Sequence, residues 1–157
     1  MGSPMLRLEL KIPPDVVWVT VAVLMWLASR ATPGMAVPDQ LRIGSAAALT
    51  VLGMVLIVAS RMALDSAGTT WHPTEPQRST HLLTMGVYRF SRNPTYVGMT
   101  LVLLSWAVLL ASPIAGVLAA FFVVYVDRFQ IRPEERILAG LFGQEFRDYT
   151  LRVRRWV

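Results

Sequence analysis

Residues 96–126 read YVGMTLVLLSWAVLLASPIAGVLAAFFVVYV, a run of 31 residues without a charged side chain. One helix of that length would extend about 46 Å, well beyond a hydrocarbon core of about 30 Å. Ser112 and Pro113 stand near the middle of the run, and proline removes a backbone donor and disfavours helix in the residue before it. The run therefore predicts a tight hairpin of two short membrane helices, with one long, kinked and tilted helix as the alternative.

Two further apolar runs precede this hairpin, Ile12–Ser29 and Ile43–Ser60. Each approaches the roughly 20 apolar residues that a membrane helix needs. The composition agrees, because 54% of the 157 residues are hydrophobic and 16% are charged, against about 25% charged in an average soluble domain. Mean hydropathy is +0.49. These values exclude a disordered chain, a collagen-like chain and most soluble domains. The absence of cysteine excludes disulfides and a catalytic thiol.

Basic residues are distributed unevenly between the two sides that four crossings would create. Thirteen of the 15 fall before the first run, between residues 61 and 95, or after residue 126, and only Arg30 and Arg42 fall on the other side. Because basic loops stay in the cytoplasm, the pattern predicts a multi-pass protein of the inner or plasma membrane. Its 61–95 loop and its C-terminal segment would face the cytoplasm.

The segment after residue 126 has the pattern of an amphipathic helix. Pro133 is suited to a first turn, and the next two residues are acidic. Apolar residues then recur at helical spacing along a surface or bundle helix; they are Ile137, Leu138, Leu141, Phe142, Phe146 and Tyr149. The predicted fold is therefore all-α: an integral membrane bundle of about four transmembrane helices, followed by a C-terminal amphipathic helix.

Two polar segments should meet at the cytoplasmic side. A hairpin over 96–126 returns the chain to the surface from which it started, so residues 81–98 and 127–135 are expected to be neighbours. Together they offer carboxylates, guanidinium groups, an amide and aromatic rings beside lipid. Such a junction suits a polar or charged cofactor that meets an apolar substrate.

The first of these segments carries a specific motif. Residues 81–98 read HLLTMGVYRFSRNPTYVG, which resembles the signature of the isoprenylcysteine carboxyl methyltransferase family, a group that includes the phospholipid methyltransferases. The tail is similar too, with RPEE at 132–135, LFGQEF at 141–146, Tyr149 and VRRW at 153–156. The similarity covers about 66–157, whereas the earlier runs match as generic membrane helices.

The resemblance implies one membrane methyltransferase domain over 1–157, with N-terminal membrane helices in 12–64 and a cofactor-binding catalytic core in 66–157. Its cofactor would be S-adenosyl-L-methionine, bound near the cytoplasmic face under the C-terminal helix. The acceptor would be lipophilic and would arrive from the bilayer: an isoprenylcysteine carboxylate, a lipid or a small apolar molecule. Membrane lipid is the expected environment; neither nucleic acid nor a metal is an expected partner.

The resemblance also implies the cofactor-binding residues. Arg92 and Asn93 could hold the carboxylate of the donor through charge-assisted hydrogen bonds. Glu134 and Glu135 are expected to hold its amino or ribose groups, and Tyr88 and Tyr96 to wall the pocket. The other expected cofactor-binding residues are Thr84, Gly86, Val87, Pro94 and Gly98, of which the two glycines would allow close backbone approach.

Arg92, Glu135 and Asp127 are the expected catalytic residues, with Asp127 as a base for a protonated nucleophile. The eukaryotic enzymes have histidine where this chain has Asn93. Asparagine cannot titrate, so a mechanism that needs an imidazole at that position is excluded here. The departure bears on the substrate more than on the cofactor.

Structural explanations compete with several of these roles. The two glutamates could simply favour a helix dipole, Arg89 and Arg92 could anchor to lipid headgroups, and Tyr88 and Tyr96 could be interfacial residues. His72 and His81 lack acidic or cysteine partners nearby, so no metal site is expected from them.

Two other functions remain open. A membrane reductase of the related sterol-reductase type would use NADPH, and its 2′-phosphate could be bound by Arg152, Arg154 and Arg155. A non-enzymatic membrane scaffold could keep the same fold without chemistry.

Overall fold

A computed structural model describes residues 9–68 and 79–157. His72 and two of the thirteen basic residues counted above, Arg7 and Arg78, lie outside this part. Within it every regular element is helical. The elements are α1 (Pro14–Ala31), α2 (Asp39–Ser66), the 3₁₀ turn η3 (Gly86–Arg89), α3 (Pro94–Leu109), α4 (Pro113–Val126), the π turn η4 (Asp127–Ile131) and α5 (Arg132–Arg152).

The helices have the length and composition of membrane spans. α1 and α2 are long and apolar enough to cross a bilayer, and so is the continuous helical stretch that begins with α4. α3 is a shorter apolar helix of 16 residues. The predicted all-α membrane bundle is confirmed, and the chain is a membrane protein.

The uncharged run forms the predicted hairpin rather than one long helix. α3 ends at Leu109, Ala111 adopts a left-handed conformation with φ 47°, and Ser112 is extended before Pro113 starts α4. The turn is tied to the connection between α1 and α2, since the Met35 N–H donates to the Ala111 carbonyl at 2.7 Å. Pro113 has no N–H to continue the ladder of α3, which explains why the chain turns at this point.

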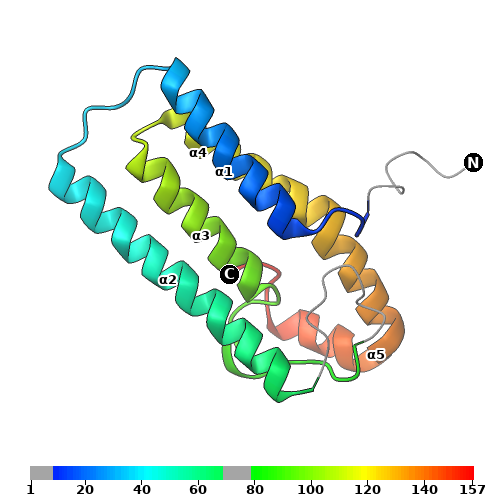
Figure 1. Ribbon diagram of the computed structural model, residues 1–157. Helices are drawn as coiled ribbons and strands as arrows, with labels where there is room; N and C mark the ends of the chain where they lie inside the picture. Colours follow the sequence, from blue (N-terminus) through cyan, green and yellow to red (C-terminus); the bar gives the residue numbers. More distant parts are fainter. Residues whose placement is uncertain (1–8, 69–78) are drawn as a thin grey trace, which may run out of the picture.

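Figure 1 shows α3 between α2 on one side and the pair α1 and α4 on the other. The core between these helices contains large side chains, among them Met25, Leu103 and Phe122, against the small Ala115 and Ala119. The start of α1, the end of α2, the start of α3 and the end of α4 all lie at the same end of the bundle (Figure 1). This end carries the polar segments.

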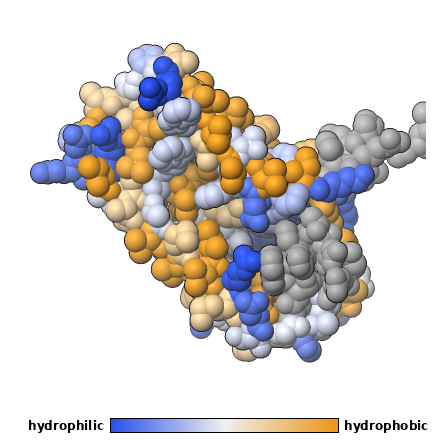
Figure 2. All heavy atoms as spheres, viewed as in Figure 1, coloured by the Kyte–Doolittle hydropathy of each residue, from blue (hydrophilic) through white to orange (hydrophobic). Residues whose placement is uncertain are grey.

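The outer surface of the bundle is apolar. Leu27 of α1 is 51% exposed, Val55 of α2 is 56% exposed and Val117 of α4 is 67% exposed. Figure 2 shows hydrophobic side chains over much of the face that these helices present. An exposed apolar surface of this extent is expected where a protein faces lipid rather than water.

The C-terminal helix is present, but it consists of two segments. Gly143 interrupts α5 with φ 52° and ψ −116°, a conformation that only glycine adopts readily. After this break the second segment turns back toward the start of α3 (Figure 1). Phe146 and Tyr149 are thereby buried at the polar end of the bundle. The periodicity predicted the helix, but not this change of direction.

Candidate active site

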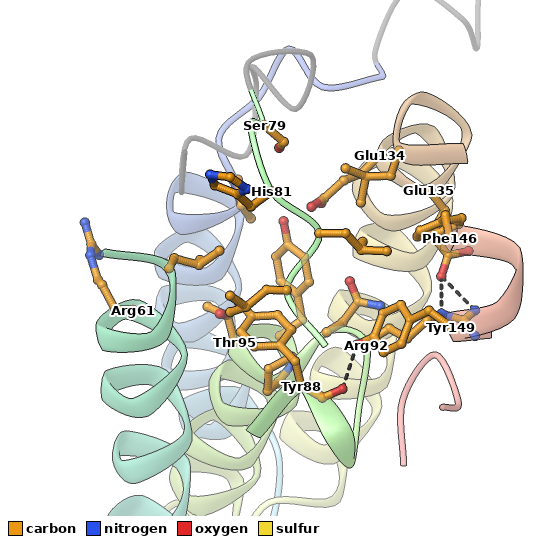
Figure 3. Close-up of a pocket in the computed structure, with 18 of the residues that line it drawn as sticks. Arg61, Ser79, His81, Tyr88, Arg92, Thr95, Glu134, Glu135, Phe146 and Tyr149 are labelled. Atoms are coloured by element: carbon orange, nitrogen blue, oxygen red, sulfur yellow. Dashed lines mark hydrogen bonds and ion pairs between the residues drawn. The ribbon is translucent and has the colours of Figure 1, made fainter. Parts of the chain in front are cut away.

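A cavity opens at the polar end of the bundle (Figure 3). Its volume is about 170 Å³, more than ten times the roughly 10–15 Å³ that one water needs. The start of α1, the end of α2, the segment 79–99 and α5 all contribute walls. Of the residues expected at the site, those on the wall are Tyr88, Arg92, Asn93, Pro94, Tyr96, Glu134 and Glu135. The two polar segments are therefore neighbours, as expected.

Glu135 is held between two arginines. Nε and NH2 of Arg92 both donate to Glu135 Oε1, at 3.0 and 2.8 Å. Arg155 donates to the other oxygen, from Nε at 3.1 Å and from NH2 at 2.7 Å. Hydrogen bonding to Glu135 is the main cause that raises the pKa of Arg155 above its ordinary value. Both carboxylate oxygens thus have protein partners.

Arg92 and Asn93 also bind the backbone of the C-terminal residues 150–155 and hold it against the site. Arg92 NH1 donates to the carbonyls of Val153 at 2.7 Å and Thr150 at 3.3 Å, and its backbone N–H donates to Arg154 O at 3.0 Å. The side-chain amide of Asn93 donates to Arg155 O at 3.0 Å. These bonds close one side of the cavity with residues 150–155.

Glu134 differs from its neighbour. Its half-buried side chain extends into the cavity from α5 (Figure 3), and it makes no hydrogen bond or ion pair with any described residue. Burial, and then the charge of Glu135, raise the pKa of the Glu134 carboxyl to about 7. A carboxyl group in this state gains most from a cationic or hydrogen-bond-donating ligand.

Aromatic rings form much of the remaining wall. The hydroxyl of Tyr149 donates to the Tyr88 carbonyl at 2.6 Å, and Tyr149 packs edge-on against Phe146 at 6.4 Å between ring centroids. Burial raises the pKa of Tyr149 to about 12, and it also raises the pKa of Tyr88. Both phenols therefore stay neutral near pH 7. Their faces can attract a cation.

The other expected residues lie away from the cavity wall. Asp127 accepts from Arg132 Nε at 2.6 Å and from Arg155 NH1 at 3.3 Å. Gly86 starts η3 with φ 60°, while Gly98 is buried against Gly53 of α2. A contact between the cofactor and these residues, or Thr84 and Val87, stays a prediction.

Several wall residues were not assigned to the site from sequence. Asp15 of α1 and Arg61 of α2 line the cavity, and so do Phe146 and Tyr149 of α5. The sequence signals for the last two were their place on the apolar face of the predicted helix and in the tail that resembles the family. Nothing in the sequence indicated that the first turn of α1 would reach a pocket whose other walls begin at Arg61, 46 positions after Asp15.

A second depression, the apolar groove, lies farther along the bundle between α1, α2 and α3. Its lining is largely apolar and includes Ala22, Val102 and Leu109 with two tryptophans. Trp18 donates its indole N–H to Met99 O at 2.9 Å, and Trp106 donates to Ala22 O at 3.1 Å. Because Met99 also lines the main cavity, this groove begins about one helical turn from it.

Comparison with known proteins finds several relatives of this chain. The family model described as phospholipid methyltransferase matches residues 41–145, so the match includes most of α2 and the predicted core up to residue 145. Protein-S-isoprenylcysteine O-methyltransferase from Rattus norvegicus is 34% identical over 112 residues, and that from Homo sapiens is 35% identical over 112. The B form from Arabidopsis thaliana is 32% identical over 111 residues.

These matches cover 67% of this chain, but 39% of the rat and human proteins and 53% of the Arabidopsis protein. The chain thus spans about two fifths to one half of the length of these curated relatives. An uncharacterized protein from Haemophilus influenzae is 37% identical over 62 residues, 40% of this chain and 98% of that protein. No solved structure matches.

Proposed function

We propose that this chain, which belongs to the phospholipid methyltransferase family, transfers a methyl group from S-adenosyl-L-methionine to a lipophilic acceptor at the membrane. The observation that carries the proposal is the Glu134 carboxyl, half-buried in a cavity with aromatic walls and without a partner among the described residues. A carboxyl so placed fits a ligand with a cationic group. The donor has two such groups, its amino group and its sulfonium.

The donor, when bound, supplies a methyl group on positively charged sulfur. The residues of this chain would hold the donor and the acceptor in the orientation that the transfer needs. Glu134 would bind a cationic part of the donor, while Tyr88, Tyr96 and Tyr149 would enclose it. Arg92 and Glu135 would act by holding residues 150–155 over the cavity, since their polar atoms already bind each other and the backbone. In-line geometry is the main requirement of methyl transfer.

The apolar groove between α1, α2 and α3 is evidence for an acceptor with an apolar chain. It is lined by Trp18, Val102 and Trp106, and it lies within the membrane-spanning part of the bundle. We place the apolar part of the acceptor in this groove and its nucleophile beside Met99. The relatives that are named for isoprenylcysteine make a prenylated carboxylate one candidate, with a lipid or a small apolar molecule as others. The site would face the cytoplasm.

Calorimetric titration of the detergent-purified protein tests the donor. S-adenosylhomocysteine and S-adenosylmethionine are titrated into wild type, Glu134→Gln and the control Glu145→Gln, which changes an exposed residue of the same helix. We expect Glu134→Gln to weaken binding at least about tenfold, as for loss of a hydrogen bond to a charged group. An equal loss for both ligands indicates that Glu134 binds the amino group. A larger loss for S-adenosylmethionine indicates the sulfonium.

Absence of binding by folded wild type would overturn the proposal. NADPH serves as the competing ligand, because a reductase would bind it instead. No structural observation favours that reading, since Arg155, one of its three expected phosphate ligands, is engaged by Glu135 and Asp127. A scaffold would bind neither ligand.

A further inference from the structure

The π turn η4 joins the last membrane span to the helix that carries Glu134 and Glu135. Arg132 N–H bonds to Asp127 O across five residues, where an α-helix would bond across four. A π turn inserts one extra residue, which rotates everything after it by about 100°. The direction in which Glu134 leaves the helix therefore depends on this turn.

Pro133 gives a physical reason for the turn. In an uninterrupted α-helix its ring would clash with the carbonyl of Phe129, and it has no N–H to bond that carbonyl. The Phe129 carbonyl instead accepts from the backbone N–H of Leu10, at 3.1 Å. Leu10 adopts a left-handed conformation with φ 58°, unusual for a leucine, to make this contact.

The same short segment makes three more contacts with this region. The Glu9 carboxylate pairs with Arg128 at 3.1 Å and with Arg136 at 2.5 Å. The side-chain amide of Gln130 donates to the Ile12 carbonyl at 2.6 Å. We name residues 9–12 the strap. Its contacts lie on both sides of the proline that interrupts the helical ladder.

Gln130 is the centre of this contact. Its side chain is fully buried, and its Oε1 has no hydrogen-bond partner among the described residues. Burying an amide whose oxygen has no partner costs free energy of folding, so the one bond that the side chain makes is the reason we consider for its presence. That bond fixes the strap directly before Pro13 and Pro14, which start α1. Pro14 and Asp15 line the cavity together with Glu134.

We propose that Gln130 and the strap are a positioning element, which holds the π turn and so fixes the direction of Glu134 and the spacing between the α1 and α5 walls of the cavity. The effect on donor binding rests on the proposed function; the effect on wall spacing does not. Gln130 does not line the cavity. It is a positioning residue that acts through Glu134 and through the spacing of the two walls.

A double-mutant cycle tests the coupling. Gln130→Met keeps the side-chain size and removes the donor, and Gln40→Met is the control at an exposed position of α2. We expect Gln130→Met to weaken S-adenosylhomocysteine binding about tenfold, the fold-change of one buried hydrogen bond of about 1.4 kcal/mol. In a Glu134→Gln background the same change should have a smaller effect, because only the part that acts through the wall spacing remains. Equal losses in both backgrounds would overturn the positioning role.

A ligand-free measurement separates this inference from the proposed function. The chain has no cysteine, so Val16→Cys on α1 and Gly140→Cys on α5, both at exposed positions, give one spin-label pair. We expect a narrow distribution of the distance between the two labels in the otherwise unchanged protein. The distribution should broaden in Glu9→Gln and in Gln130→Met, and not in Gln40→Met. Unchanged widths would overturn the inference even if the donor binds. Glu9→Gln keeps the test intact if Gln130→Met does not fold.

Discussion

Arg92 and Glu135 are 43 residues apart in the chain, yet two guanidinium nitrogens of Arg92 converge on one oxygen of Glu135 at 3.0 and 2.8 Å. Their side chains are 12% and 15% exposed. The pair joins the signature before α3 to the first turn of α5. Arg155 binds the second oxygen, so this pair is the fixed part of the site, whereas Glu134 beside it is the open part.

Replacing Glu135 by glutamine should destabilise the fold. The amide would turn an N–H₂ group toward one of two guanidinium groups and would leave both without a counter-charge. We expect a loss of about 3 kcal/mol, the size found when one partner of a buried pair is removed. Thermal unfolding in detergent measures it, with Glu145→Gln as the exposed control. An unchanged melting temperature would contradict the assigned role.

The closest approach of α2 and α3 should not tolerate a methyl group. A Cβ on Gly53 would lie 2.7 Å from Gly98 O, and one on Gly98 would lie 2.6 Å from Gly53 O. Both contacts are with backbone, so the helices must move apart. We expect Gly53→Ala or Gly98→Ala to cost about 1–3 kcal/mol of stability.

Gly44 provides the control on the same helix, because a Cβ there meets nothing within 4 Å. Gly44→Ala should be neutral or stabilising, by up to about 1 kcal/mol. A similar loss of stability in Gly53→Ala, Gly98→Ala and Gly44→Ala would show that the close contact between α2 and α3 is not the cause.

Stability should fall as the pH rises through the range in which Glu134 titrates. The pKa of its carboxyl is about 7 in the folded protein against an ordinary value of 4.5. Below pH 4.5 both states hold the proton, so Glu134 contributes no penalty. Between pH 4.5 and 7 only the unfolded state loses its proton, which favours unfolding progressively. Above pH 7 the penalty is constant.

The difference in melting temperature between wild type and Glu134→Gln isolates this contribution from other titrating groups. We expect wild type to lose stability relative to the variant from about pH 4.5 to about pH 7. A constant difference over that range would show that the Glu134 carboxyl ionises at its ordinary pKa.

The break in α5 should depend on glycine for conformational reasons alone. Gly143 has φ 52° and ψ −116°, but a Cβ there would meet no atom within 4 Å. Gly143→Ala should therefore cost about 1–3 kcal/mol through backbone strain and displace Phe146 and Tyr149 from the cavity. Unfolding and S-adenosylhomocysteine titration measure the two effects. Gly140→Ala, three residues earlier in open space, should produce neither.

The hairpin, the membrane spans and the neighbourhood of the two motifs could all be predicted from sequence. Ser112 and Pro113 break a run too long for one crossing, and a hairpin must return to its own side. Such features depend on local chain chemistry and on the thickness of a bilayer. The break at Gly143 and the strap could not be predicted in the same way. A glycine in a helical pattern permits a break without requiring one, and the strap is defined by contacts with residues that are distant in the chain.

Gly98 illustrates the difference. Its place in the motif predicted close backbone approach, and close approach is what the structure has, but to Gly53 of α2. A glycine in a helix leaves room for a close neighbour. The identity of that neighbour is decided by helix packing.

By itself the sequence determined that this chain crosses the membrane as a helical bundle, and that a polar site with two adjacent glutamates lies at one end of it. Only the tertiary structure decided which glutamate is open to a ligand. Neighbouring residues on a helix point about 100° apart. The π turn before Pro133 sets the rotation of α5 about its axis relative to α4, and with it Glu135 points to two arginines and Glu134 into the cavity.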